Sequence, residues 1–199
     1  MEWIVITPPE FLDDEARHIA TLFQAGVDRV HLRKPDGTAA DIVRLLEQIP
    51  QRWHDRIVLH DHHELCARYA LGGVHLNGRN PVPPTERCGT LSRSCHSLQE
   101  VADNRDRCDY LFLSPIFDSV SKQGYTSAFT SEQLQEARRQ GTIDRKVYAL
   151  GGVTQEHIPT VRALGFGGAV MLGEVWNHLR QSETAAQQYL SKVEPLIHQ

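Results

Sequence analysis

The chain has 199 residues and a formal net charge of −4, and its isoelectric point is near 6.2. This length allows one substantial hydrophobic core, and no Pro/Gly/Ser-rich linker divides the chain, so we expect a single domain over residues 1–199. The slightly acidic balance argues against nucleic acid or an anionic membrane as a partner. We find no apolar run of membrane-spanning length and no signal-peptide pattern, which predicts a cytoplasmic protein.

The predicted strands are short apolar segments, many of them rich in β-branched residues. Most lack the alternation of a half-exposed sheet, as expected for parallel strands that are covered on both faces. In chain order they are Trp3–Thr7, Val30–Leu32, Ile57–His60, Gly73–Leu76, Thr90–Ser94, Tyr110–Leu113, Val147–Leu150 and Gly168–Met171.

Amphipathic stretches between these strands predict helices, with Ser97 and Thr154 as candidate N-caps. They are Asp13–Ala25, Ala39–Gln48, Glu64–Ala70, Leu98–Asn104, Ser131–Gln140, Gln155–Ala163 and Glu174–Ile197. The segment 77–84 has too many helix breakers and is expected to be a loop. Eight strands alternating with helices fit an α/β fold, a compact (β/α)₈ TIM barrel, with a doubly wound open sheet as the alternative.

The loop after the sixth predicted strand is the most informative stretch. The strand stops at Pro115, and the loop then carries Ser119, Ser121 and Lys122. Two hydroxyls and a lysine can donate hydrogen bonds and place one positive charge on a phosphate or diphosphate. A plain polar surface loop is the alternative interpretation.

Other chemically versatile residues also follow predicted strands, and in a barrel the carboxyl ends of all strands face one mouth. Two glycine-bearing turns, Gly151-Gly152 and Leu172-Gly173, follow the seventh and eighth strands and suit a phosphate, because a helix begins just beyond each. The remaining candidates at strand ends are His31, Arg33, His60, Asp61, Asn77, Asn80, Ser94 and His96.

Histidines and cysteines raise the question of a metal site or of disulfides. The run from His60 to Glu64 contains zinc-type ligands, but its geometry is poorly defined, and a loop with one functional Asp61 is favoured. We expect His75 to be a hydrogen-bonded core residue, and Trp53 and Trp176 to be packing residues.

The cysteines lack CxxC spacing and are predicted to be reduced, buried thiols: Cys66, Cys88, Cys95 and Cys108.

The whole chain resembles the thiamine phosphate synthase family, which also includes thiazole tautomerases of the TenI type. The order and spacing of several short motifs carry the resemblance: His31-Leu32-Arg33-Lys34, Leu59-His60-Asp61, Gly73-Val74-His75-Leu76, Ser94-Cys95-His96-Ser97, Ser114-Pro115-Ile116-Phe117, Ser119-Val120-Ser121-Lys122 and Gly151-Gly152-Val153. The resemblance implies a homo-oligomeric barrel acting on hydroxyethyl-thiazole phosphate. It implies that Gly152 and the turn after the eighth strand hold the thiazole phosphate. Arg33, Ser94 and Lys122 would hold a pyrimidine diphosphate.

The chain departs from the synthase pattern at several positions. His31 stands where that pattern has glutamine, and His60 stands where it has asparagine. Pro35 stands where the pattern has lysine, so this lysine is lost unless Lys34 substitutes for it. Asn80 replaces the second aspartate of the Mg²⁺ site and leaves Asp61 as its one carboxylate, which weakens the site without abolishing it. Mg²⁺ is therefore expected as a cofactor only if synthase activity is retained.

These departures narrowly favour a TenI-like thiazole tautomerase, with His96 as the proton-transfer group. An imidazole can accept and return a proton near neutral pH. The alternatives are a thiamine-phosphate synthase that joins hydroxymethylpyrimidine diphosphate to thiazole phosphate and a non-catalytic binder of a thiamine precursor. An unrelated phosphosugar or metal-dependent barrel enzyme also stays open.

Overall fold

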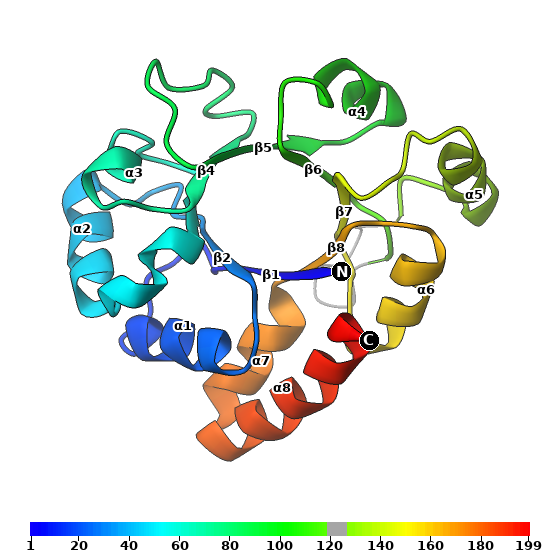
Figure 1. The fold of residues 1–199 in the computed structure, drawn as a ribbon. Coiled ribbons are helices and arrows are strands. Elements are labelled where there is room, and N and C mark those ends of the chain that lie inside the picture. Colours follow the sequence, from blue (N-terminus) through cyan, green and yellow to red (C-terminus); the bar gives the residue numbers. More distant parts are fainter. Residues whose placement is uncertain (119–126) are drawn as a thin grey trace.

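The structure is a computed structural model that describes residues 1–118 and 127–199. Its eight strands form a closed, all-parallel barrel in which each strand pairs with the next along the chain and β8 closes on β1. Figure 1 looks down this barrel and shows the strands as an inner ring with the helices outside. The (β/α)₈ prediction is confirmed, and the open sheet is excluded.

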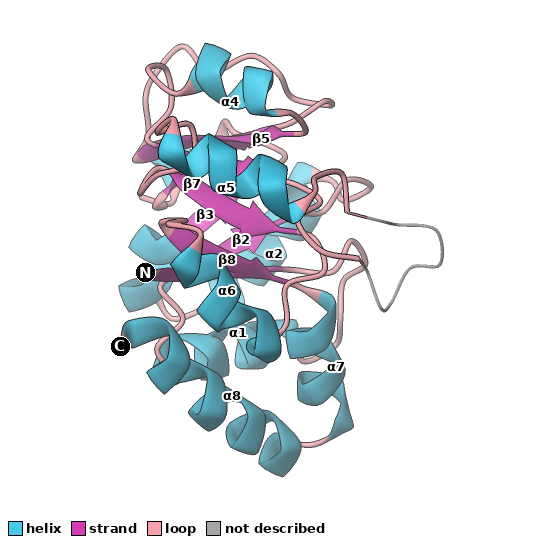
Figure 2. Cartoon of the chain, turned by 90° about the vertical axis from the view of Figure 1, so that its right-hand side faces the viewer, coloured by secondary structure: helices cyan, strands magenta, loops and turns pink. Residues whose placement is uncertain are grey.

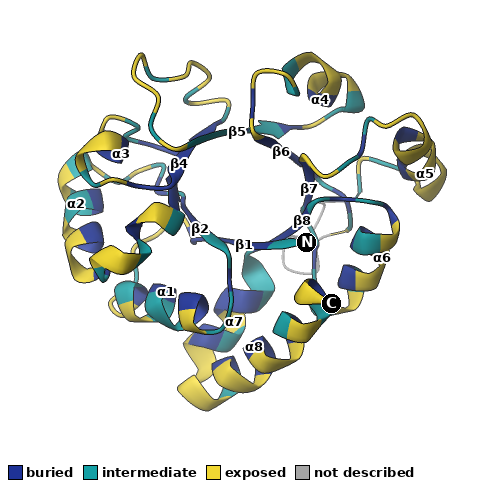
Figure 3. Cartoon of the chain, in the orientation of Figure 1, coloured by how far each residue is buried: buried dark blue, intermediate teal, exposed yellow. Residues whose placement is uncertain are grey.

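All eight predicted strands are present, and their ends differ from the prediction by no more than one residue. The strands are β1 Glu2–Ile6, β2 Arg29–Leu32, β3 Ile57–Leu59, β4 Gly73–Leu76, β5 Thr90–Cys95, β6 Tyr110–Leu113, β7 Val147–Leu150 and β8 Gly168–Met171. Figure 3 shows that most of the strand ring is buried, whereas the outer faces of the helices are exposed. Burial on both faces explains why most of these strands lack an alternating pattern.

The helices surround the barrel, as the side view in Figure 2 also shows. They are α1 Glu15–Gln24, α2 Ala39–Gln48, α3 Leu65–Arg68, α4 Leu98–Asn104, α5 Ser131–Arg139, α6 Ile158–Ala163, α7 Gly173–Gln181 and α8 Glu183–His198, with 3₁₀ turns η1 Gln51–Arg56 and η2 Gln155–His157. Ser97 caps α4, since its side chain accepts the N–H of Glu100. The loop prediction for 77–84 is also confirmed.

The predicted long C-terminal helix was wrong, because two helices occupy Glu174–Ile197. Ser182 separates them, with an extended backbone at φ −171° and ψ 161°. Its hydroxyl oxygen accepts the N–H of Ala185 at 3.1 Å. The serine therefore starts α8 instead of continuing α7, as N-cap chemistry favours.

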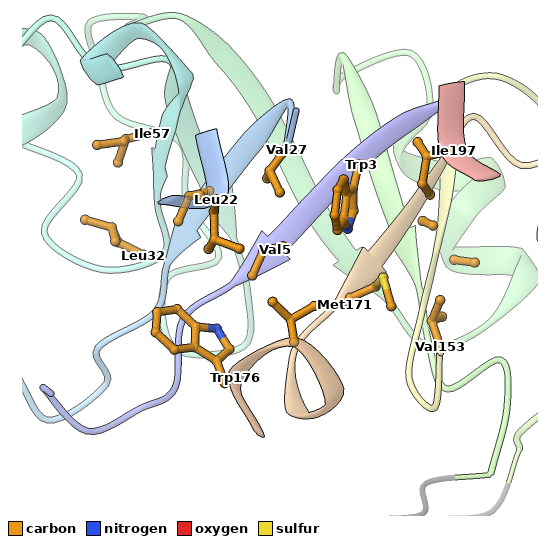
Figure 4. Packing of buried hydrophobic residues seen from close by; sticks show 14 of the residues in the cluster. Trp3, Val5, Leu22, Val27, Leu32, Ile57, Val153, Met171, Trp176 and Ile197 are labelled. Carbon is orange, nitrogen blue, oxygen red and sulfur yellow. The ribbon is translucent and has the colours of Figure 1, made fainter. Parts of the chain in front are cut away.

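Alternation along the strands divides the core into two layers. Trp3 and Val5 point outward and pack under the helices, whereas Ile4 and Ile6 point into the barrel. Figure 4 shows Trp3 and Val5 among the apolar side chains of the outer layer. Trp176 is buried in this layer and donates its indole N–H to the Ile6 carbonyl at 2.8 Å.

The cysteine prediction was wrong for one pair. Cys66 on α3 and Cys88 before β5 form a disulfide with Cα atoms 5.9 Å apart. Cys95 and Cys108 are free and buried, as predicted. The fold brings Cys66 and Cys88 together across a 22-residue sequence separation, which no local spacing rule could reveal.

Among the described residues, no helix is long and apolar enough to cross a membrane.

Candidate active site at the barrel mouth

The carboxyl ends of the strands place the candidate residues around one mouth of the barrel. Asp61 follows β3, and both of its carboxylate oxygens accept hydrogen bonds. Its Oδ1 accepts from Arg79 Nη2 and from Asn80 Nδ2, each at 2.9 Å, and its Oδ2 accepts from Arg79 Nη2 at 3.2 Å. The Lys34 backbone N–H also donates to Oδ2 at 3.2 Å. Arg79 Nε also donates to Oδ1 at 3.2 Å, so five hydrogen bonds from described residues engage the two oxygens of this carboxylate.

This arrangement does not suit the predicted Mg²⁺ site. Magnesium in proteins is commonly bound through one or two carboxylates. Here a guanidinium stands against Asp61, and the amide of Asn80 presents its donor nitrogen to the same oxygen. A cation at Asp61 would have to displace Arg79, so the residues present do not fit the ion.

Lys34 cannot replace the lysine that is missing from the synthase pattern. Its side chain is buried and its ammonium donates to Glu15 Oε2 at 2.8 Å, the Pro8 carbonyl at 2.9 Å and the Glu10 carbonyl at 2.6 Å. This lysine holds the segment between β1 and α1 and does not face a ligand.

Residues His31 and Ser94 each bond to histidine rings inside the barrel. His31 is fully buried, with Nδ1 at 2.9 Å from His60 Nε2 and Nε2 at 2.9 Å from the Tyr110 hydroxyl, so neither ring nitrogen is free for a substrate. The Ser94 hydroxyl lies 2.8 Å from His75 Nε2. The expectation that His75 is a hydrogen-bonded core residue is confirmed.

His96 lies directly after β5 and is exposed. Its Nδ1 is 3.2 Å from the Ser114 carbonyl oxygen. The Ser114 hydroxyl lies at the same 3.2 Å from Nδ1. The carbonyl can only accept a hydrogen from Nδ1, whereas the hydroxyl can donate one to it, so these two contacts are compatible with either neutral tautomer. Among the described residues, Nε2 has no hydrogen-bond partner. His96 therefore presents Nε2 at the mouth, and Nε2 is a proton acceptor in the tautomer whose Nδ1–H bonds the Ser114 carbonyl.

The glycine turn after β7 requires glycine for two reasons. Gly151 and Gly152 have φ of +91° and +66°, where side chains are disfavoured. A Cβ atom on Gly152 would also lie 2.5 Å from the Asp118 carbonyl oxygen. Because both residues are glycines, no side chain prevents the backbone of this turn from approaching a ligand closely.

The turn after β8 leads directly into α7. Leu172 is its N-cap residue and supplies no side-chain cap. Glu174 in the first turn instead accepts the N–H of Gln155 at 3.1 Å, at the start of η2. Of the two helix starts beside the glycine turns, the start of α7 at Gly173 is thus the one that no side chain within 1–118 and 127–199 caps, which suits an anion.

Ser119, Ser121 and Lys122 lie outside the described residues, so their role remains a prediction. Arg33 is partly exposed after β2. Sequence reasoning missed Arg79, whose guanidinium forms an ion pair with the Asp61 carboxylate. The available signal was its position as the sole charged residue in the loop 77–84.

Comparisons with known proteins identify the family. The family described as thiamine monophosphate synthase matches residues 3–175. The chain belongs to this family. A thiamine-phosphate synthase of Parasynechococcus marenigrum is 28% identical over 95% of the chain and 55% of that protein, so the chain spans about half of this relative. One from Photorhabdus laumondii is 26% identical over 81% of the chain and 79% of that protein.

Solved structures of two thiamine phosphate pyrophosphorylases share the fold. The thiamine phosphate pyrophosphorylase of Bacteroides thetaiotaomicron matches with a TM-score of 0.88 and 41% identity, over 98% of this chain and 97% of that one. The thiamine phosphate pyrophosphorylase from Pyrococcus furiosus has a TM-score of 0.77 at 16% identity, over 98% and 94%, and supports the fold alone. Membership of the family places the chain in thiamine biosynthesis.

Proposed function

We propose that the protein binds hydroxyethyl-thiazole phosphate or a closely related thiazole phosphate and catalyses proton transfer on the thiazole, as a TenI-like tautomerase. The observation that carries this choice is that Arg79 and Asn80 donate hydrogen bonds to the Asp61 carboxylate, which leaves this carboxylate unsuited to a metal ion. A synthase has to stabilise a departing diphosphate, for which a metal or fixed cations are the usual means. A tautomerase needs only an anion anchor and a proton-transfer group.

The proposed chemistry uses His96 Nε2 as the general base. Nε2 takes a proton from a carbon of the thiazole ring while Nδ1–H stays bonded to the Ser114 carbonyl. The imidazolium then returns a proton to another position of the ring, so no proton or electron is gained or lost overall. The Ser114 carbonyl would stabilise the charged intermediate and fix the orientation of the ring.

The phosphate anchor can be tested with a matched pair of glycine variants. We expect Gly152→Ala to weaken binding of hydroxyethyl-thiazole phosphate at least about tenfold in titration calorimetry, because the new Cβ displaces the Asp118 carbonyl. Gly141→Ala is the control, since Gly141 also has positive φ, +74°, but a Cβ added there would meet nothing within 4 Å. Equal affinities in both variants would argue against the anchor.

The proton-transfer role can be tested by replacing His96. His96→Gln should lower tautomerase turnover about a hundredfold or more, because the base is lost, while thiazole phosphate binding stays nearly intact. His178→Gln, on α7 and stacked on Tyr189, is the control and should turn over like wild type. Unchanged turnover in His96→Gln would remove the mechanism. A wild type that binds thiazole phosphate without turning it over would indicate a precursor binder.

A second candidate is thiamine-phosphate synthase, which the names of the relatives favour. A cavity of about 530 Å³ beside Asp61 could accept a second substrate. If this activity exists, Mg²⁺ should be required and Asn80→Asp should raise it, because a carboxylate would be added beside Asp61. Robust formation of thiamine phosphate by the wild type, unchanged in Asn80→Asp, would favour the synthase over the tautomerase.

The small-molecule phosphate substrate, the absence of nucleic-acid and membrane partners, the cytoplasmic location and the homo-oligomeric state remain predictions. Light scattering of the purified protein would measure the oligomeric state.

A further inference from the structure

Beneath the mouth, three buried histidines from three different strand segments meet inside the barrel. His31 on β2, His60 after β3 and His75 on β4 each offer a nitrogen, and these nitrogens all lie within 4.8 Å of one another. Alternation explains the convergence, because the neighbouring Leu32, Leu59 and Val74 belong to the outer layer of the core. The three histidines therefore point inward.

The surroundings of these rings resemble the outer shell of a metal site. His31 Nε2 bonds the Tyr110 hydroxyl at 2.9 Å, and His75 Nδ1 bonds the Ser92 hydroxyl at 2.8 Å. Such a bond on the far nitrogen of His31 orients a metal-binding imidazole and fixes its tautomer. The near nitrogens of His31 and His60 face each other at 2.9 Å. Burial lowers the pKa of all three imidazoles below the usual value, which keeps them in the neutral form that binds metals.

We propose that His31, His60 and His75 form a buried binding site for a borderline divalent transition-metal ion, of which Zn²⁺ is the natural probe. Imidazole suits such ions, whereas the oxygen ligands that Mg²⁺ prefers are absent from the trio. The ion would replace the shared hydrogen between His31 and His60. Its Zn–N distances of about 2.0–2.1 Å would separate these two nitrogens by a few tenths of an ångström more than the hydrogen bond does.

Coordination also requires one local movement. The rings of His60 and His75 are stacked, with centroids 4.2 Å apart and planes inclined by 20°. A metal lies close to the plane of each imidazole that binds it, so the His75 ring must turn out of the stack. Its Nε2 would then leave the Ser94 hydroxyl, which becomes available as an oxygen neighbour of the ion. His60, at 4% exposed, is the least buried of the three and follows β3 at the end of the barrel that faces the mouth.

The experiment is metal binding by tag-free protein stripped with a chelator. After dialysis against micromolar Zn²⁺, we expect about one equivalent per chain by elemental analysis, and Co²⁺ should give the visible absorption of a tetrahedral site. His31→Gln and His60→Asn keep polar side chains and should each weaken Zn²⁺ binding at least about tenfold. Circular dichroism verifies that both variants fold.

The control is His62→Gln, because His62 neighbours the cluster in sequence but bonds the Gly37 carbonyl instead, at 2.7 Å. It should bind Zn²⁺ like wild type. Less than stoichiometric binding by the wild type, or binding that survives both His31→Gln and His60→Asn, would overturn the proposal and leave a hydrogen-bonded polar core. Loss of binding in His62→Gln alone would place the ion at the surface and overturn it equally.

Discussion

The partners of single residues at the mouth give them roles that differ from those their sequence positions suggest. Asp61 has the position of a metal ligand, yet Arg79 and Asn80 turn it into the centre of an ion-paired cluster. Lys34 stands in a motif of ligand-binding cations, yet its ammonium is buried against Glu15. Removing a charged group from water is costly unless it is paired. Such a lysine therefore has a structural role that its sequence position does not reveal.

Replacing Lys34 tests this structural role. Lys34→Met should destabilise the protein by about 3–5 kcal/mol, because it leaves Glu15 buried without its partner. Burial raises the pKa of Glu15 and lowers that of Lys34, and the ion pair offsets the desolvation of both groups. Urea denaturation provides the measurement. The double variant Lys34→Met/Glu15→Gln should recover part of the loss, and a single variant as stable as wild type would contradict this account.

At the scale of elements, caps and turns determine where helices start and what they can bind. Glu174 belongs to α7 but satisfies the start of η2 through Gln155. The open start of α7 then follows a β8 turn on the same mouth as the glycine turn after β7. The split between α7 and α8 is a similar case, since one serine decides whether the chain continues as a helix or begins a new one.

The capping role of Ser182 predicts a measurable loss of stability. Ser182→Ala should destabilise the protein by about 1 kcal/mol, because the N–H of Ala185 loses its acceptor. Ser191→Ala is the matched control on the same helix. The Ser191 hydroxyl donates to the Gln188 carbonyl within α8, so its loss should change stability by less than about 0.5 kcal/mol. Chemical denaturation curves that coincide for the two variants would exclude the cap.

At the scale of the whole molecule, the two ends of the chain meet on the barrel. Figure 1 places the N- and C-termini near each other beside β1 and α8. His198, at the end of α8, bonds Asp28 at 3.1 Å and Glu194 at 3.2 Å. Asp28 in turn accepts the backbone N–H of Trp3 at 2.7 Å. Through the Asp28 side chain, this contact ties the end of α8 to β1.

The tie between His198 and Asp28 predicts a pH dependence. Burial alone would lower the pKa of His198, but hydrogen bonds to Asp28 and Glu194 raise it above 6.5 overall. The stabilisation is therefore fully present below about pH 6.5 and is lost as the pH rises through the raised pKa. His198→Gln should be less stable than wild type at pH 5.5, and the difference in thermal midpoint should shrink by pH 9. A difference independent of pH would refute the charged contact.

The barrel could be predicted from the amino-acid sequence, because buried parallel strands need apolar β-formers and the spacing between these strands leaves room for one helix per unit. It also located the glycine turns, because paired glycines directly after an apolar strand indicate a backbone that needs positive φ, and Gly151 and Gly152 both have it. Tertiary structure alone decided which side chains meet. Pairing of β2 with β3 and of β3 with β4 brings His31 close to His60 and His75. The segments that follow or precede these neighbouring strands bring Asp61 to Arg79 and Cys66 to Cys88. Such partners are set by three-dimensional distance, which local periodicity does not encode.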